Sequence, residues 1–177
     1  MSKTDFFWKL AYLAAAGGVF MIDQTTKAWA SARLRLEGDI EVIPGFFNFA
    51  YAQNTGVAFS MFDDHGDAGR WGLSAVAVIA GILVIYFFWR IPRSDDRILG
   101  ALCLLLAGIV GNVVDRLRLG YVIDFLDVQF GSWHYPTFNV ADMAIVIGAG
   151  ILMLDLFISK KKGSEPSAEI QKTKTEI

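Results

Sequence analysis

Cysteine and histidine are scarce in this chain, which has 177 residues but only one Cys and two His. A single cysteine excludes an internal disulfide, and Cys103 lies in an apolar run where we expect a packed, inert thiol. His65 and His134 do not have the spacing of a metal site, and the sequence contains neither HExxH nor GxSxG. We therefore expect no metal and no other cofactor.

Charge is also scarce, because Asp, Glu, Lys and Arg make up only 19% of the residues. The net charge is −2 and there is no basic stripe, so we expect no nucleic-acid partner. Hydrophobic residues reach 54%, whereas a soluble domain has about 45–50%. The mean hydropathy of +0.44 agrees with a membrane protein.

Four apolar stretches are long enough to cross a bilayer, which takes about 20 residues per helix. They predict an all-α membrane protein, a four-helix transmembrane bundle with spans at about 6–29, 71–89, 98–114 and 138–158. The first stretch resembles a cleavable signal peptide, but polar residues within it favour a retained helix. We expect one integral membrane domain over residues 1–162 and a disordered cytoplasmic tail over 163–177.

The distribution of Lys and Arg predicts the orientation of these spans. Four spans place both termini on one side, where ten of the sixteen basic residues fall. The positive-inside bias then puts the termini in the cytoplasm and both long loops outside. The ten residues are Lys3, Lys9, Arg90, Arg93, Arg97, Lys160, Lys161, Lys162, Lys172 and Lys174.

The two outer loops contain strand-like sequences. Residues 46–52 are aromatic and partly alternating, 41–43 are a candidate partner strand, and 121–127 also read as a strand. We expect a small sheet that lies on the membrane. The loop acids Asp63, Asp64, Asp67 and Asp127 are expected to be solvated.

Polar residues gather near the outer ends of the spans, where they are costly in lipid. Each group also has a purely structural interpretation. Asp23 and Lys27 are four residues apart and could form an exposed ion pair. Asn112, Asp115 and Arg116 share a helix face, and an alternative is that they end the helix in water. Asn139 could cap the last helix with Asp142 as its first-turn acid.

Asp124 is harder to explain structurally, because it lies between Val122-Ile123 and Phe125-Leu126. It precedes Asp142 by 142 − 124 = 18 residues, a separation over which the chain can fold back. Two carboxylates that lie about 3 Å apart share a proton, because only one of them is ionised at a time. One then takes a proton from water and the other donates to a carbonyl, which predicts amide hydrolysis without a covalent intermediate.

Five sequence blocks together resemble the lipoprotein signal peptidase (signal peptidase II) family: Asp23–Lys27, Asn54–Phe59, Gly111–Arg116, Val122–Phe125 and Phe138–Asp142. The resemblance implies a bacterial inner-membrane aspartic endopeptidase that removes the signal peptide from prolipoproteins, just before a diacylglyceryl-modified cysteine. It also implies a small extracytoplasmic β-cradle on the bundle, an active site near the outer face, contact with membrane lipid and inhibition by globomycin.

The same resemblance assigns roles to residues of this chain. Asp124 and Asp142 match the catalytic pair, while Asp23 and Lys27 match a block that supports the site. The residues that match the substrate-binding pocket are Asn54, Gly56, Asn112, Asp115, Arg116 and Asn139.

A small transporter or an assembly factor is the alternative class, in which the polar cluster would be an ion or solute path. Such a path needs polar residues at several depths, whereas the polar residues of this chain gather near the outer ends of the spans. The sequence also has no internal repeats of the kind found in many transporters. The glycines of Gly108-x-x-Gly111 and Gly148-x-Gly150 permit close helix packing within one bundle or between two.

Overall fold

Four long helices and a small antiparallel sheet make up the structure, a computed structural model that describes residues 3–56, 66–131 and 133–163. The helices are α1 (Lys3–Glu37), α2 (Gly66–Arg90), α3 (Asp96–Leu119) and α4 (Val140–Gly163). The strands are β1 (Ile40–Ile43), β2 (Phe47–Asn54), β3 (Val122–Phe130) and β4 (Trp133–His134). The predicted disordered tail, apart from Gly163, lies outside the described residues, as do positions 57–59 of the second sequence block.

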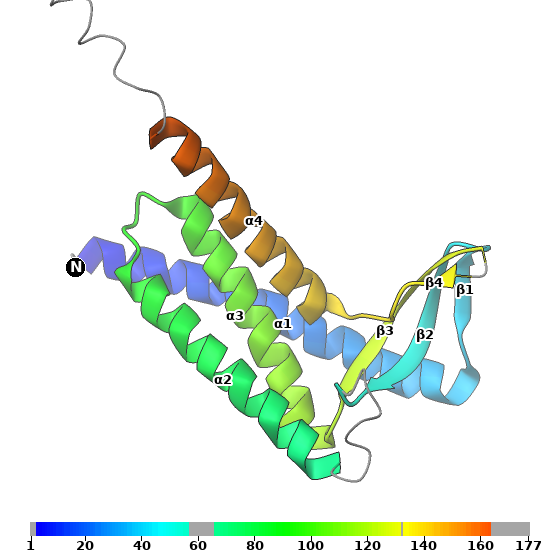
Figure 1. Cartoon of the computed structure of the whole chain (residues 1–177). Coiled ribbons are helices and arrows are strands. Elements are labelled where there is room, and N and C mark those ends of the chain that lie inside the picture. The colour runs from blue at the N-terminus through cyan, green and yellow to red at the C-terminus, as the bar shows by residue number, and fades with distance from the viewer. Residues whose placement is uncertain (1–2, 57–65, 132, 164–177) are drawn as a thin grey trace, which may run out of the picture.

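Each of the four helices is long and apolar enough to cross a membrane, which confirms the predicted fold class. The chain runs up and down through the bundle, and the sheet projects from one end of it (Figure 1). We call this end the sheet end; the N-terminus and the α2–α3 connection lie at the opposite end (Figure 1).

Helix α1 is longer than the span predicted at 6–29 and reaches past the bundle. Its 35 residues extend for about 50 Å, whereas a bilayer core is about 30 Å thick. The helix ends at Gly38, whose φ of 87° is unfavourable for other residues and whose N–H donates to Leu34 O at 3.0 Å. The predicted span ended at residue 29 because Arg33, Arg35 and Glu37 make the next turns too charged for a membrane, although no proline or glycine interrupts the helix there.

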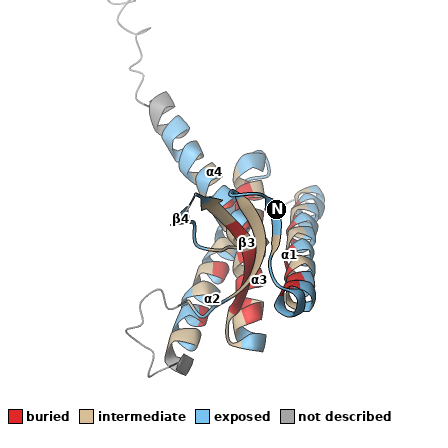
Figure 2. Cartoon of the chain, turned by 90° about the vertical axis from the view of Figure 1, so that its right-hand side faces the viewer, coloured by how far each residue is buried: buried red, intermediate tan, exposed pale blue. Residues whose placement is uncertain are grey.

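The sheet has the order β1-β2-β3-β4, with every neighbouring pair antiparallel. Strand β3 is central and mostly buried, as the red ribbon in Figure 2 shows. Ile123 and Phe125 of β3 pack with Ala30 and Leu34 of α1, so the projecting end of α1 supports the sheet. The three strand segments predicted from sequence correspond to β1, β2 and β3, although β2 and β3 run further.

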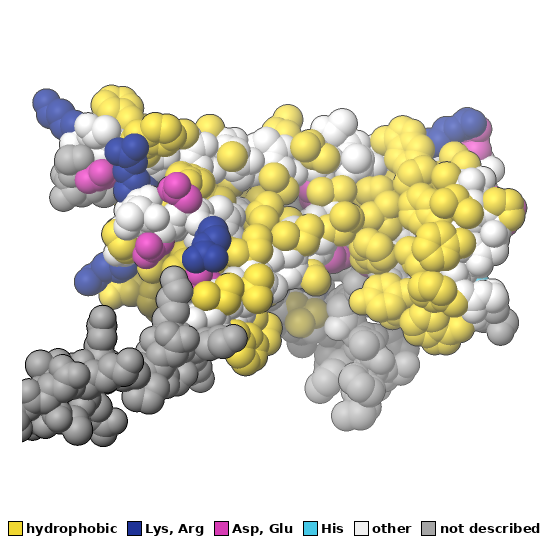
Figure 3. Space-filling view, turned by 90° about the horizontal axis from the view of Figure 1, so that it is seen from above, with side chains coloured by type: hydrophobic (Ala, Val, Ile, Leu, Met, Phe, Trp, Pro, Cys, Tyr) yellow, Lys and Arg dark blue, Asp and Glu magenta, His cyan; other side chains and the backbone are white. Residues whose placement is uncertain are grey.

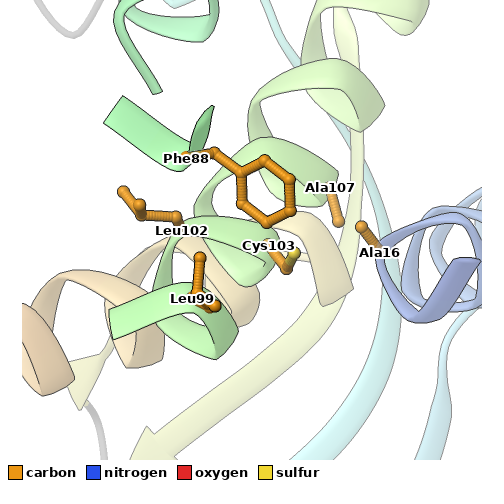
Figure 4. Close-up of a cluster of buried hydrophobic side chains, with 6 residues drawn as sticks. All are labelled: Ala16, Phe88, Leu99, Leu102, Cys103 and Ala107. Atoms are coloured by element: carbon orange, nitrogen blue, oxygen red, sulfur yellow. The ribbon is translucent and has the colours of Figure 1, made fainter. Parts of the chain in front are cut away.

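A second apolar cluster holds the helices together toward the opposite end (Figure 4). It consists of Ala16, Phe88, Leu99, Leu102, Cys103 and Ala107. Cys103 is buried in it, as predicted for a packed thiol. Lys9 is also buried nearby, and its ammonium donates to the carbonyls of Phe88, Trp89 and Ile91 at 2.8, 3.1 and 2.9 Å. This lysine therefore satisfies the free carbonyls at the end of α2.

Candidate active site

Asp124 lies on the central strand β3, where its position opposite Ala52 of β2 is set by the strand register. Its side chain is buried and accepts hydrogen bonds from Asn54 Nδ2 at 2.9 Å and Asn139 Nδ2 at 2.6 Å. Burial raises the pKa of Asp124 to about 6, and the charge of Asp142 adds to the rise, while the two asparagines oppose it. This carboxyl group therefore keeps its proton at a higher pH than an ordinary aspartate.

Asp142 stands in the first turn of α4, and Asn139 precedes that helix as its N-cap. Asp142 N donates to Asn139 Oδ1 at 2.9 Å, and Asn139 N donates to Asp142 Oδ2 at 3.1 Å. This reciprocal pair is a capping box, so the structural interpretation of these two residues is correct. The capping role also fixes the direction of the Asp142 carboxylate, because one of its oxygens is held by the helix start.

Two asparagine amides connect the carboxylates. Asn139 Nδ2 contacts both Asp124 and Asn112 Oδ1, the latter at 3.2 Å, and Asn112 Nδ2 donates to Asp142 Oδ1 at 2.8 Å. Lys27 Nζ donates to Asn112 Oδ1 at 3.0 Å. Because a lysine only donates, it fixes the oxygen of Asn112 toward itself and the nitrogen toward Asp142.

Lys27 is the centre of a buried charge cluster below these amides. Its ammonium lies 2.9 Å from Asp23 Oδ2 and 2.9 Å from Asp115 Oδ2, so together with Asn112 its three protons have three acceptors. Asp23 Oδ1 accepts from Ala141 N at 2.8 Å, and Asp115 Oδ2 accepts from Ile123 N at 3.2 Å. The cluster thereby ties α1, α3, α4 and β3 together at the site.

The burial of these side chains rules out two of the structural interpretations that the sequence left open. Asp23 and Lys27 do pair, but their side chains are only 1% and 2% exposed, so the pair is not a solvated surface contact. Asn112 and Asp115 are buried and α3 continues to Leu119, so they do not end the helix in water.

Arg116 and Gly56 meet at the edge of the site. Gly56 has a φ of 79°, and a side chain there would collide with Leu73 and come within 3.8 Å of Arg116 Nη2. Gly56 N donates to Asn54 Oδ1 at 2.8 Å, which leaves the Asn54 nitrogen for Asp124. The Arg116 guanidinium interacts electrostatically with Asp142, Asp124 and Asp115. The structure thus brings together all ten residues that the sequence predicted for the site.

Two residues near the site were not assigned a role from the sequence. Gln24 Nε2 lies 3.2 Å from Asp23 Oδ2 and 3.1 Å from Asp115 Oδ1, bridging the two acids around Lys27. Arg70 donates to the carbonyl of Arg116 through Nε at 2.7 Å and holds the last turn of α3. A polar residue within a span was the signal for Gln24, whereas Arg70 looked like an ordinary residue at a span boundary.

The expectation that Asp127 is solvated is wrong. It lies on β3, is 8% exposed, and accepts from Asn48 Nδ2 at 3.0 Å, with His134 Nδ1 at 3.1 Å. These hydrogen bonds lower its pKa below the usual value for aspartate. Asp127 therefore joins β2, β3 and β4. The other acids of that expectation, Asp63, Asp64 and Asp67, have no described side chains.

A polar hollow of about 490 Å³ opens above Asp124. Its lining includes the side chains at the end of β2 and the segment that leads to α4, namely Ala52, Gln53, Asn54, Thr55, Gly56, Asp124, Pro136 and Thr137. Its volume falls within the range of about 300–1,000 Å³ that is usual for ligand pockets. Over residues 3–56, 66–131 and 133–163, His, Cys, Asp and Glu side chains form no group of three that could hold a metal ion.

Fold and site together define an integral membrane protein that holds two linked carboxylates at one end of its helix bundle. The comparisons with known proteins agree with this class. The family model described as Signal peptidase (SPase) II matches residues 15–158. The chain therefore belongs to the signal peptidase II family, a family of peptidases, and is a multi-pass protein of the bacterial inner membrane.

Similar proteins cover nearly the whole chain. A lipoprotein signal peptidase of Alteromonas mediterranea is 40% identical over 88% of this chain and 85% of its own length. One from Pseudomonas paraeruginosa is 38% identical over 92% of this chain and 97% of its own. A solved structure of a bacterial membrane enzyme aligns with a TM-score of 0.76 at 29% identity, covering 89% of this chain and 94% of that one.

Proposed function

We propose that this chain is an aspartic endopeptidase that removes the signal peptide from diacylglyceryl-modified prolipoproteins, on the N-terminal side of the lipidated cysteine. The observation that carries the proposal is the amide network that holds Asp124 and Asp142, from two different elements, in one hydrogen-bonded cluster. The relatives are lipoprotein signal peptidases, which supports a lipoprotein precursor as the substrate.

In this proposal Asp124 is the acid and Asp142 the base. Asp124 has the raised pKa, and Asp142 lies at a helix N-terminus, where backbone N–H groups favour negative charge. Asp142 takes a proton from water as the water oxygen adds to the scissile carbonyl carbon, and Asp124 gives its proton to the carbonyl oxygen. The C–N bond then breaks as Asp142 protonates the leaving nitrogen and Asp124 recovers a proton from the diol.

The neighbouring residues position the substrate and the pair. Asn54 and Gly56 line the polar hollow and are placed to contact the substrate backbone. Arg116 has a buried Nε without a hydrogen-bond partner among the described residues, so we assign its guanidinium to a substrate carbonyl. Asn112 and Asn139 orient the carboxylates, while Asp115, Asp23 and Lys27 form the buried charge cluster that holds the Asn112 oxygen.

Cleavage of a diacylglyceryl-modified peptide by the purified protein tests the proposal. Asp124→Asn and Asp142→Asn keep size and most hydrogen bonds but remove proton exchange, so each should lower kcat at least about a hundredfold. The double variant should be hardly worse than either single one, because the pair acts as a unit.

Asp39→Asn is the matched control, since Asp39 is exposed and lies outside the site. Asp127→Asn is less suitable, because Asp127 joins three strands. Globomycin binding, which we expect to persist in the single variants at least in part, shows that they are folded. Substantial cleavage by either single variant would refute the aspartic mechanism.

A further inference from the structure

The two carboxylates open onto two hollows, of which one has many polar side chains in its lining and the other has few. Asp124 lines the polar hollow of about 490 Å³, and Asp142 lines an apolar groove of about 260 Å³. The segment 135–138 contributes to both: its middle residues Pro136 and Thr137 line the polar hollow, whereas its end residues Tyr135 and Phe138 line the apolar groove. The cleavage site therefore has a polar side and an apolar side.

The apolar groove runs along the outward face of α4. Asp142, Met143, Val146 and Ile147 line it and follow the spacing of one helix face. Val146 is 70% exposed and Ile147 49%, in a helix apolar enough to span a membrane. The groove thus begins at the Asp142 carboxylate and continues along a surface that meets lipid.

We propose that this groove binds an acyl chain of the substrate's lipid group while the peptide backbone occupies the polar hollow. A peptide backbone needs hydrogen-bond partners at every residue, and apart from Asp142 and the Tyr135 hydroxyl the groove lining offers no polar side chain. An acyl chain needs no such partners, and it reaches the groove directly from the lipid that the same surface meets.

The occupant follows from the position of the groove beside the proposed catalytic pair. The relatives are named for lipoproteins, and a lipid attached next to the scissile bond begins at a surface that adjoins the pair. A larger apolar groove of about 570 Å³, lined by residues of α1, α3 and α4, is lined by neither carboxylate of the pair and includes Asp96 and Arg97 at the start of α3. This inference rests on the proposed function.

The test compares diacylglyceryl peptides with palmitoyl chains and with butyryl chains, cleaved by the full-length protein in detergent. Val146→Trp fills the apolar groove and should raise KM for the palmitoyl peptide by about tenfold, or about 1.4 kcal/mol, because the indole occupies the space of the chain. KM for the butyryl peptide should change little. Ile147→Trp is a second variant on the same groove and should act in the same way.

Leu154→Trp is the matched control. Leu154 is also an exposed residue of α4, at 60%, but it lines the larger groove at the far end of the bundle. It should leave both KM values unchanged. Equal effects of Val146→Trp on both peptides, or a chain-length effect in Leu154→Trp alone, would overturn the acyl-groove assignment while leaving the proposed peptidase activity intact. Failure of the unaltered protein to cleave either peptide would instead refute the proposed function, and this inference with it.

Discussion

At the scale of single residues, the site depends on Lys27, which sets the orientation of the Asn112 side-chain amide. Lys27 is buried and meets two carboxylates and one amide oxygen. Removal of one partner from a buried ion pair is costly because it leaves an uncompensated charge. Here the lysine has a second consequence, since it turns the Asn112 nitrogen toward Asp142. Lys27, which precedes Asn112 by 85 residues in the chain, thus directs the Asn112 N–H donor toward Asp142, the proposed base.

Our first prediction at this scale concerns the pH dependence of cleavage. Burial raises the pKa of Asp124 to about 6, and the hydrogen bond from Asn54 opposes that rise. If Asp124 is the acid, kcat/KM should fall as pH rises through about 6, where the free enzyme loses this proton. Asn54→Ala removes a donor that favours the ionised form, so the fall should move to higher pH.

Asn48→Ala provides the control for this measurement. Asn48 is also on β2, but its amide donates to Asp127 and not to Asp124. Its substitution should leave the pH of the fall unchanged even if the rate drops. A shift to lower pH in Asn54→Ala would contradict the assigned proton position.

At the scale of elements, α3 and α4 pack closely because glycines face the partner backbone. A side-chain carbon at Gly148 would lie 2.7 Å from Ala101 O and 3.1 Å from Leu105 N. At Gly150, two residues further on the same helix, nothing lies within 4 Å. The sequence showed both glycines as candidates for close packing, and the structure assigns that role to the first.

We therefore predict opposite effects of the same substitution at these two glycines. Gly148→Ala should lower the free energy of unfolding by about 1–3 kcal/mol, because the backbone of α3 does not yield easily. Gly150→Ala should be neutral or stabilising by up to about 1 kcal/mol, because alanine is the better helix former. Thermal unfolding in detergent measures both, and equal melting temperatures would contradict the assigned packing.

Much of the element structure was predictable from the sequence because hydropathy and β-propensity are local signals. The four apolar stretches marked the helices, and the aromatic alternation of residues 46–52 marked β2. The extension of α1 to Glu37 was not predictable from hydropathy, since its support comes from Ile123 and Phe125 in a distant strand. Asp127 was misjudged for the same reason: its partners Asn48 and His134 are brought to it by strand pairing.

For the site, the sequence identified the residues but not their connections. Asp124 stood out because its neighbours are apolar, and Asp142 because it opens an apolar run. Which amide joins them depends on how α3, β3 and α4 converge, and no local pattern contains that information. In the capping box of Asn139 and Asp142, the Asp142 carboxylate that starts the helix is also the proposed catalytic base.

At the scale of the whole molecule, charge is distributed unequally between the two ends of the bundle. Lys and Arg side chains gather at the end opposite the sheet on the face shown in Figure 3. The sheet end has acids on and around the strands: Glu37, Asp39, Glu41, Asp124 and Asp127. By the positive-inside bias we infer that the sheet, and with it the carboxylate pair, faces the periplasm. A signal peptide would then be cut where a precursor leaves the membrane.

This orientation predicts which introduced cysteines an impermeant thiol reagent reaches in intact cells with a permeabilised outer membrane. Asp39 is exposed between α1 and β1, and Ser94 is exposed between α2 and α3. The native Cys103 is buried and should stay unlabelled. Asp39→Cys should react before lysis, whereas Ser94→Cys should react only after it, because the two positions lie at opposite ends of helices long enough to span the bilayer. Labelling of Ser94→Cys alone in intact cells would place the carboxylate pair on the cytoplasmic side, where the proposed cleavage of a translocated precursor could not occur.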